Sequence, residues 1–438
     1  MEKYLENVAV IGAAGKMGSG IALVLLQEIA LAAEKYQKNV RLKLIDANEE
    51  SLTSLKSYLL TQMIKYSEKN IIALREIYKD NMDLVSNREI IDHFVMKAMD
   101  FLTLTISLEE VTSATLIFEA IVEDYDVKCQ ILKTISALCS GETFFLSNTS
   151  SIPISSLDKG AELDHRIVGF HFYNPPAIQK LVEIVFPENV NPELAVFADT
   201  LASKLKKTAV HSPDVAGFIG NGHFIPEAVY ACKRVRELAK TIPLHEAIYL
   251  VDKITKDLLL RPMGIFQLID YVGIDVTQKI AATMRHFLKN DSLQDPLIDQ
   301  MVENKLLGGQ HSNGSQKEGF FKYIKNDPIG YYDFVKLNYA NLDSEDWAIK
   351  LNADPIFHSN HCNWKELSND KNREIKIQEH FNRLRESNSY IAKIAIEFLD
   401  ESMKIARSLV EKGTAYSLSD VSTVLKLGFM HLYGPEDL

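Results

Sequence analysis

The sequence has few cysteines, no long uninterrupted apolar run and no excess of positive charge, and each absence excludes a class of protein. Four cysteines in 438 residues are too few for a disulfide framework, and none forms a CxxC pair. The longest apolar run, residues 21–33, contains Gln27 and Glu28 and is too short to span a bilayer. The acidic N-terminus lacks the features of a secretory or organellar leader. We therefore expect a cytoplasmic protein with no membrane partner.

Charge and composition narrow the class further. Lys and Arg number 48 against 59 Asp and Glu, a formal net charge of −11, so nucleic acid would meet no general electrostatic attraction. Hydrophobic residues make up 46% and charged residues 24%, which is typical of globular proteins. We expect a folded chain of about three domains that holds any anionic ligand through local groups.

Short apolar runs alternate with helix-patterned or turn-rich segments in the first half of the chain. Residues 8–12 form an apolar run that ends in glycine, as expected of a strand buried on both faces. The segment 49–100 is charged and helix-patterned. This alternation predicts a doubly wound α/β domain that extends to about residue 210. The predicted strands are residues 8–12, 40–45, 102–106, 115–118, 143–146 and 166–172.

From residue 218 the pattern changes to long helices with no convincing strand. A turn-forming cluster at 212–214 marks the break. Residues 225–268 and 391–438 are loosely similar, each a helical stretch that leads into a glycine-containing segment ending in leucine. A coincidence between two amphipathic helical pairs would give the same pattern. We predict three units: residues 1–211, an α/β domain; 212–325, a helical domain; and 326–438, a second, degenerate helical copy.

A glycine-rich turn follows the first predicted strand. Residues 12–18, Gly-Ala-Ala-Gly-Lys-Met-Gly, open the next helix and place Gly12, Gly15 and Gly18 where a pyrophosphate could meet backbone N–H groups. Asp46 ends the second strand, where a carboxylate can accept hydrogen bonds from a ribose and repel a 2′-phosphate. Asp46 could instead cap a helix or a turn. We predict a Rossmann-type NAD site that includes Lys16 and Met17.

Polar side chains gather in three further stretches, at the ends of predicted strands or beyond them. These stretches are residues 147–151 (SNTSS), 171–176 (HFYNPP) and 180–183 (KLVE). Ligands of open α/β sheets bind beyond the carboxyl ends of the strands, where these residues are expected. Each stretch alone has an ordinary explanation, such as a helix cap, a buried histidine or a surface charge. Together they predict a catalytic site.

Several motifs in one order make the chain resemble the L-3-hydroxyacyl-CoA dehydrogenase family. They are the glycine loop, FEAIVE at 118–123, SNTSS, HFYNPP, KLVE, AGFIGN at 216–221, RPMGIFQLIDYVGID at 261–275 and EGFFKY at 318–323. The resemblance covers residues 7 to about 325. It implies a Rossmann domain that binds NAD, a helical domain that closes over a thioester, and interconversion of L-3-hydroxyacyl-CoA and 3-oxoacyl-CoA, as in fatty acid β-oxidation.

The resemblance also implies roles for individual residues. His171 matches the family base, and histidine suits this role because its ordinary pKa lies near neutrality. Glu183 matches the glutamate that orients the imidazole. Ser150 matches the serine that hydrogen-bonds the substrate oxygen, and Asn221 matches the asparagine that helps to place histidine and substrate.

Further positions match cofactor and substrate contacts of the family. Glu123, Lys128 and Asn174 fall at NAD-contact positions, and Asn148 is expected near the nicotinamide. Lys69, in a lysine-bearing helical segment, matches a family lysine that contacts coenzyme A, although such lysines more often lie on a solvated helix face.

The chain departs from the family pattern at four places. The glycine loop has one residue more than GxGxxG, and Val215-Ala216 replaces Thr-Pro. Gly222 replaces a basic residue, and Ser315 stands where a lysine usually reaches the cofactor. These changes bear on substrate range and cofactor affinity more than on reaction type.

Two other functions and two assembly states stay open. A dehydrogenase of a free 3-hydroxy acid would need no coenzyme A, and a non-catalytic NAD-binding protein could be built on the same fold. Packing of the second helical copy on the first would permit a monomer, with a homodimer as the alternative. His358, His361 and Cys362 lack the spacing of a metal site, and we interpret them as loop residues and predict no metal.

Overall fold

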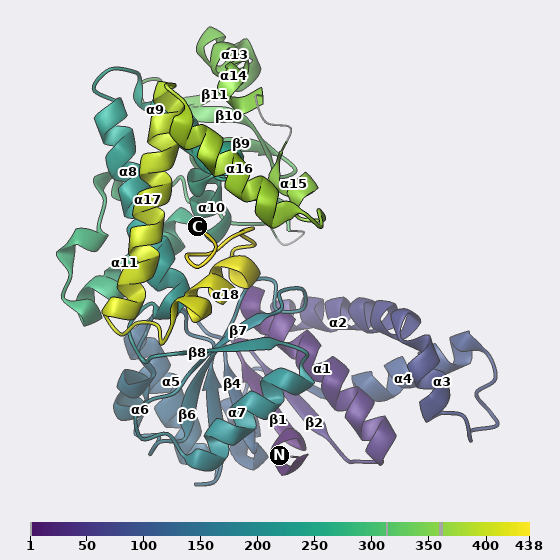
Figure 1. Cartoon of the computed structure of the whole chain (residues 1–438). Coiled ribbons are helices and arrows are strands. Elements are labelled where there is room, and N and C mark those ends of the chain that lie inside the picture. Colours follow the sequence, from purple (N-terminus) through teal and green to yellow (C-terminus); the bar gives the residue numbers. More distant parts are fainter. Residues whose placement is uncertain (1, 312–313, 359–361) are drawn as a thin grey trace. The chain divides into compact units, whose positions relative to one another are not determined.

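The computed structural model describes residues 2–311, 314–358 and 362–438, and the chain divides into two compact units, residues 1–214 and 215–438 (Figure 1). The division lies close to the break predicted after residue 211. The first unit is a mixed sheet covered by helices, and the second is mainly helical. The predicted fold, a Rossmann-type α/β domain followed by a helical region, is confirmed.

The sheet of the first unit has eight strands in the order β3-β2-β1-β4-β5-β6-β7-β8. All neighbouring pairs are parallel except β6 and β7. The order reverses at β1, as in dinucleotide-binding folds. The strands are β1 (Asn7–Ile11), β2 (Arg41–Ile45), β3 (Leu102–Thr105), β4 (Leu116–Glu119), β5 (Phe144–Ser147), β6 (Ile167–Phe172), β7 (Leu181–Val185) and β8 (Thr208–Ser212).

Helices lie on both faces of this sheet (Figure 1). The side chain of Asn48 accepts from Ser51 N at the start of α2, and Ser86 and Glu89 form a capping box at the start of α4. The carboxylate of Asp214 accepts from the N–H groups of Ile154 and Ser155 at the start of α6. The helices are η1 (Glu2–Leu5), α1 (Lys16–Tyr36), α2 (Glu49–Lys69), α3 (Ile71–Ile77), α4 (Asn87–Asp100), η2 (Leu108–Ser113), α5 (Tyr125–Leu138), α6 (Ile154–Ala161) and α7 (Pro192–Lys204).

The six predicted strands are all present as β1 to β6, but the sequence did not predict β7 and β8. β8 lies at the edge of the sheet and exposes Thr208, Ala209 and His211, so its apolar signal is weak. β7 carries Glu183 inside an otherwise apolar run. Because this charge interrupts the apolar run, the sequence pattern indicated a polar motif and not a strand.

Long helices build most of the second unit. α8 packs against α9, α17 and α18, and α17 also packs against α16. Their apolar faces share one core with the segments between them. The helices are α8 (Phe218–Leu238), α9 (Leu244–Lys253), the π-helix η3 (Ile254–Leu258), α10 (Ile265–Val272), α11 (Ile274–Leu288), η4 (Asp291–Leu293), α12 (Pro296–Glu303), η5 (Leu342–Ser344), α13 (Asp346–Asn352), α14 (Pro355–His358), α15 (Trp364–Leu367), α16 (Arg373–Glu386), α17 (Tyr390–Glu411) and α18 (Leu418–Gly428).

The second unit also contains a small antiparallel sheet, so the prediction of all-α structure after residue 218 was wrong in this part. The strands are β9 (Phe321–Ile324), β10 (Asp327–Asp333) and β11 (Asn338–Asn341), in the order β11-β10-β9. Lys325 and Asn326 form the turn between β9 and β10, and Lys325 has φ +59°. A polar two-residue turn between aromatic runs is a hairpin signal that could have been read. The predicted boundary between residues 325 and 326 falls in this turn.

The C-terminal helices pack on α8 within the second unit. Gly222 lies at this contact, and a Cβ atom there would lie 3.2 Å from Leu409 Cδ2 and 3.3 Å from Thr414 Cγ2, so these side chains would have to shift. Arg261 and Glu227 form a buried bidentate ion pair with N–O distances of 2.8 and 3.0 Å, and Arg261 also donates to Ser402 Oγ of α17. A side chain at position 222 would therefore crowd α17 and the segment that follows it. Descent of the region 326–438 from a copy of the preceding domain stays a prediction.

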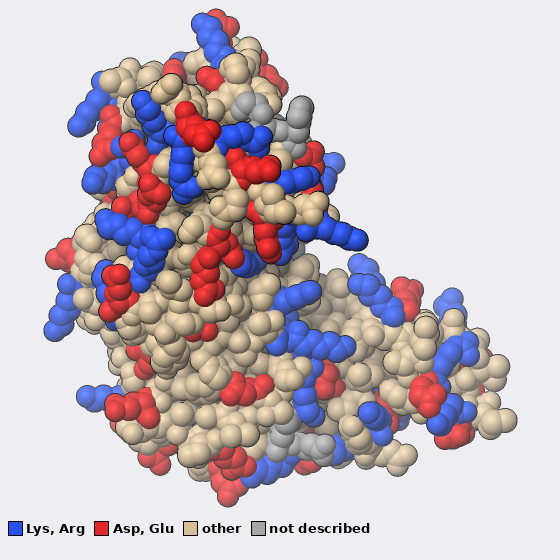
Figure 2. Space-filling view, in the orientation of Figure 1, with Lys and Arg blue, Asp and Glu red and all other residues tan. Residues whose placement is uncertain are grey.

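The longest apolar helix and the cysteines can both be located in the structure. Among the helices that the structure describes, α1 is long and apolar enough to cross a membrane, but most of it is buried within the first unit, as in a core helix. All four cysteines lie in the described part of the chain, and none of them forms a disulfide. On the described surface in Figure 2, acidic and basic side chains are interspersed.

Candidate active site

The carboxyl ends of the parallel strands bring the predicted motifs to one edge of the first unit. β1 leads into the glycine loop, β4 ends at Glu119, β5 ends at Ser147, and β6 carries His171 one residue before its end. Parallel neighbours place these ends side by side. This is the edge at which open α/β sheets bind ligands.

The glycine loop needs two of its glycines for conformation and packing. Gly12 has φ +76°, and a Cβ atom there would lie 2.7 Å from Ala120 O. A Cβ atom on Gly18 would lie 2.0 Å from Gly12 O, so this glycine lets α1 approach the turn. Gly15 is the N-cap of α1 and provides no side-chain cap. No side chain at the cap position therefore covers the positive end of this 21-residue helix.

Asp46 faces this loop. Its Oδ2 accepts from Ala14 N at 2.9 Å, and its Oδ1 accepts from Asn48 N at 3.3 Å. The Asp46 carboxylate thus stabilises the glycine loop, residues 12–18, which is one residue longer than GxGxxG. Asn48, not Asp46, caps α2 through its side chain. Asp46 therefore lies beside the glycine loop, and its predicted contact with a ribose stays a prediction.

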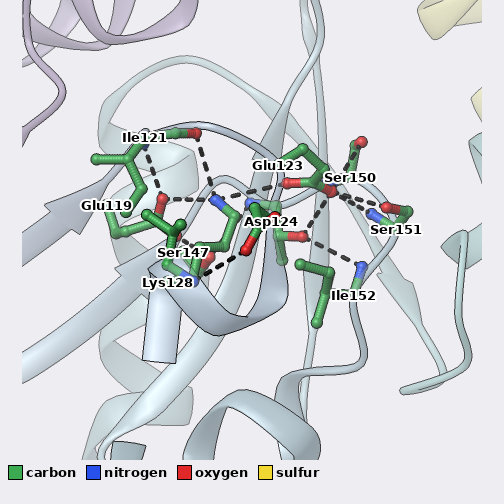
Figure 3. Close-up of polar contacts among 11 residues, drawn as sticks. Glu119, Ile121, Glu123, Asp124, Lys128, Ser147, Ser150, Ser151 and Ile152 are labelled. Carbon is green, nitrogen blue, oxygen red and sulfur yellow. Dashed lines mark hydrogen bonds and ion pairs between the residues drawn. The ribbon is translucent and has the colours of Figure 1, made fainter. Parts of the chain in front are cut away.

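A buried ion pair lies between β4 and α5 (Figure 3). Lys128 Nζ donates to Glu119 Oε1 at 2.6 Å and lies 3.4 Å from Glu123 Oε2. Ser147 Oγ donates to the other Glu119 oxygen at 2.5 Å. Burial would lower the pKa of Lys128, but the two carboxylates outweigh burial and raise it. With only 1% of its side chain exposed, Lys128 serves here as an internal counter-ion, and its predicted NAD contact stays a prediction.

Glu123 organises the segment that follows β5 (Figure 3). Its Oε1 accepts from Thr149 Oγ1 at 2.8 Å, from Ser150 N at 2.9 Å and Oγ at 3.2 Å, and from Ser151 N at 2.9 Å and Oγ at 2.8 Å. Burial would raise the pKa of Glu123, but Lys128 and these donors hold it below its ordinary value. Ser150 is thereby held through both its backbone and its hydroxyl.

His171 and Glu183 meet across the antiparallel strands β6 and β7. The two residues are direct register partners, and His171 Nδ1 lies 3.1 Å from Glu183 Oε2. Glu183 is fully buried and His171 is 9% exposed. A carboxylate only accepts, so Nδ1 carries the hydrogen and Nε2 keeps a lone pair. The structure brings together the base and the acid that the sequence predicts.

The two predicted asparagines of the first unit follow β5 and β6, which are neighbours in the sheet. Asn148 Oδ1 accepts from Phe172 N at 2.9 Å and so ties the segment after β5 to the end of β6. Asn174 follows Tyr173 and precedes a cis peptide bond to Pro175. Their predicted contacts with the cofactor stay predictions.

Three predicted residues lie apart from these clusters in the chain. Lys69 is exposed in the last turn of α2, and Lys16 is exposed in the first turn of α1. Asn221 lies in the first turn of α8, in the second unit. That helix starts at Gly217, which has φ +87°, and a Cβ atom there would lie 2.6 Å from Met284 Sδ.

The metal prediction concerns residues near the C-terminal helices. Within residues 2–311, 314–358 and 362–438, no group of three or more His, Cys, Asp or Glu side chains could hold a metal ion. His358 ends α14 and its Nε2 lies 2.6 Å from Asn352 O, so it is a helical residue and not the loop residue predicted. His361 lies outside the described residues.

Sequence reasoning missed four residues of the site: Glu119, Ser147, Ser151 and Tyr173. Tyr173 Oη donates to Glu183 Oε2 at 2.8 Å, the oxygen that also faces His171. Glu119 ends a buried apolar strand with a charge, which is a signal for a buried partner. Tyr173 lies two residues after His171, so an extended backbone predicts that both side chains share one face.

Comparison with known proteins gives consistent matches. Family models described as "3-hydroxyacyl-CoA dehydrogenase, NAD binding domain" and "3-hydroxyacyl-CoA dehydrogenase, C-terminal domain" match residues 7–215 and 217–323. The mitochondrial hydroxyacyl-coenzyme A dehydrogenase of Sus scrofa is 30% identical over 321 residues, 73% of this chain and 91% of the relative. A 3-hydroxybutyryl-CoA dehydrogenase of Mycobacterium tuberculosis is 29% identical over 317 residues, 72% of this chain and 99% of the relative.

A solved structure extends the likeness in fold to almost the whole chain. The crystal structure of 3-hydroxybutyryl-CoA dehydrogenase from Escherichia coli K12 covers 98% of this chain and 90% of its own, with a TM-score of 0.61 and 18% identity. The region after residue 323, which neither family model matches, therefore has a counterpart in a known fold.

Proposed function

Because the chain belongs to the 3-hydroxyacyl-CoA dehydrogenase family, we propose that it oxidises an L-3-hydroxyacyl-CoA to the 3-oxoacyl-CoA with NAD, as in β-oxidation, and that His171 is the general base. The observation that carries this proposal is the pairing of His171 Nδ1 with the buried Glu183 carboxylate at 3.1 Å. The pair leaves Nε2 as the proton acceptor.

The proposed step moves one proton and one hydride. The hydroxyl proton of the substrate passes to His171 Nε2 as the C–O bond becomes a carbonyl, and the hydride leaves C3 with the electron pair of its C–H bond. NAD, when bound, accepts that hydride. Glu183 stabilises the imidazolium that forms and holds the ring so that Nε2 points away from the carboxylate. In the reverse direction the imidazolium returns the proton to the oxygen.

Ser150 and Asn221 are proposed to place the substrate oxygen. The five hydrogen bonds to Glu123 Oε1 from the segment 149–151 support this role for Ser150, because they define the position of its Cα and hydroxyl. The family match over residues 217–323 supports Asn221, which lies within that domain.

The glycine loop fits the cofactor of the family. Gly12 and Gly18 leave no space for side chains, and Gly15 opens α1 without a side-chain cap, so a pyrophosphate could approach the helix end. Asp46 lies against the same loop, where we propose that it accepts from a ribose hydroxyl and disfavours a 2′-phosphate. Lys16, Met17, Glu123, Lys128, Asn148 and Asn174 are proposed to complete the site.

The substrate is proposed to be an acyl-CoA thioester that binds partly through Lys69, which is exposed at the end of α2. A cytoplasmic location is proposed with it, supported by the four unpaired cysteines. We also propose a monomer, because α17 and α18 already pack on α8 within the second unit.

The direct test is reduction of 3-oxoacyl-CoA thioesters of increasing acyl length, followed by NADH absorbance. We expect turnover on at least one thioester, little on the free 3-oxo acids, and a preference for NADH over NADPH. The length series identifies the acyl chain that fits.

The variant His171→Ala tests the assigned base. Loss of a general base should lower kcat by about 10²–10⁴-fold, while NADH binding followed by fluorescence stays unchanged. Turnover that survives this substitution would remove His171 from the mechanism. Tight NADH binding with no turnover of any thioester or acid by the unmodified protein would contradict the proposed reaction.

A further inference from the structure

We propose that Tyr173 is a positioning residue of the proton-transfer pair, acting on His171 through the Glu183 oxygen that both side chains approach. This inference rests on the proposed function, because it assigns a second control over the same base. The observation that carries it is that His171 Nδ1 and Tyr173 Oη lie 3.1 and 2.8 Å from one atom, Glu183 Oε2.

The register of the sheet explains how the three side chains meet. His171 lies directly opposite Glu183 in the antiparallel pair β6–β7. Tyr173 comes two residues later, so an extended backbone turns its side chain to the same face as His171. Diagonal neighbours in antiparallel pairs are within reach of aromatic side chains. The rings of His171 and Tyr173 accordingly lie 4.9 Å apart between centroids, at 44°.

Tyr173 can only act as a donor toward a carboxylate, in either protonation state of His171. Burial raises the pKa of the Tyr173 hydroxyl, and the charge of Glu183 raises it further, so the phenol stays protonated near neutral pH. The donated hydrogen bond stabilises the negative charge of Glu183. It thereby weakens the pull of that charge on an imidazolium, and it restrains rotation of the carboxylate.

Three described elements that pack around this pair, β8, β5 and α6, carry side chains there that are uncharged or that bond elsewhere. On β8, Val210 is the register partner of Glu183 and carries no charge. On β5, Ser147 pairs with Gly169 and donates its hydroxyl to Glu119. On α6, which packs on β6, Asp158 lies 3.2 Å from His165 Nδ1. Tyr173 is a neutral donor to the Glu183 oxygen that also faces His171, so its hydrogen bond can affect the charge that His171 experiences.

The test is Tyr173→Phe, which removes only the hydroxyl. The protonation of His171 is followed by NMR of the imidazole nitrogens, and kcat/KM for hydroxyacyl-CoA oxidation is followed over the same pH range. We expect the titration midpoint of His171 and the acid limb of the rate profile to move together to higher pH, by about half to one unit. A residue with only a structural role would not shift either curve.

Two control variants separate this role from a general effect on folding. Tyr78→Phe breaks another tyrosine–glutamate hydrogen bond in the same unit, from Tyr78 Oη to Glu34 Oε2 at 2.7 Å, and should leave both curves unchanged. In a Glu183→Gln background, Tyr173→Phe should cause no further shift, because the shared charge is already gone.

The outcomes are distinct. An upward shift in the Tyr173→Phe protein that disappears in the Glu183→Gln background supports the proposal. An unchanged His171 titration, or an equal shift in both backgrounds, overturns it. The NMR titration needs no substrate, so it decides the role of Tyr173 even if no thioester is turned over and the proposed function fails.

Discussion

Two carboxylates of the first unit, those of Glu123 and Glu183, differ in the groups that surround them. The Glu123 cluster consists of Glu119, Glu123, Lys128 and residues 149–151, and the Glu183 cluster consists of His171, Tyr173 and Glu183. Glu123 accepts five hydrogen bonds on one oxygen and faces an ammonium with the other. Glu183 Oε2 faces an imidazole and a phenol.

This difference in partners suits the Glu123 cluster to holding the backbone in place and the Glu183 cluster to proton transfer. Amides, hydroxyls and a buried ammonium keep their protons near neutral pH, so the Glu123 cluster can hold backbone in place but cannot exchange a proton. An imidazole gains and loses a proton in that range, so the Glu183 cluster can. Four predictions test this contrast, from the largest expected effect to the smallest.

Removing the ammonium should have the largest effect. Lys128→Met leaves the buried Glu119 carboxylate and the partly buried Glu123 carboxylate without their counter-ion, so we expect the free energy of unfolding to fall by about 3–5 kcal/mol. Urea denaturation measures this loss. Lys133→Met, on the same helix, breaks an exposed pair with Glu162 and should change stability by no more than about 1 kcal/mol. Equal losses in both variants would contradict a special role for the buried pair.

Neutralising the other carboxylate should affect rate more than stability. Glu183→Gln removes the charge that stabilises the imidazolium, so we expect kcat to fall roughly a hundredfold, equivalent to about 2.7 kcal/mol. Steady-state kinetics and a urea titration of the same preparation give both values. A variant that loses stability but keeps its kcat would place Glu183 with Glu123 as a structural group.

Glu123→Gln should have an effect that depends on pH. The pKa of Glu123 is lowered in the folded state, so its contribution to stability is complete above the ordinary carboxyl pKa and is lost as the pH falls toward the lower folded value. We expect the variant to be less stable than the unmodified protein at neutral pH, by about 1.5–3 kcal/mol for the lost charged hydrogen bonds. Urea midpoints at neutral pH and near pH ~3 test the sign, and a difference that grows on acidification would refute it.

A single donor to Glu123 should matter least. Ser151→Ala removes one of five hydrogen bonds to Oε1, so we expect a loss of about 1 kcal/mol in stability and little change in kcat. Ser150→Ala removes a comparable donor but should lower kcat, because its hydroxyl is proposed to contact the substrate. Similar rates for the two variants would argue against that contact.

The prediction of the first unit from sequence succeeded where the signals are local. Strands β1 to β6 are short strand-forming runs of four to six residues, and the glycine loop joins one of them to a largely buried helix. β8 was missed because this edge strand exposes three of its five residues, and β9 to β11 were missed because short polar turns separate runs that mix polar and apolar residues. In the sequence, Gly222 is a departure from a family position that usually carries a basic residue. Only the structure shows that this position lies against Leu409 of α17.

The sequence by itself determined the class of fold and the family, and it predicted the glycine loop and the pairing of His171 with Glu183, since these follow from short motifs and from their order along the chain. Only the tertiary structure decided that Lys128 joins Glu119 to Glu123, and that Tyr173 and His171 share one oxygen of Glu183. Strand register and side-chain direction govern such contacts, and both depend on how distant segments pack.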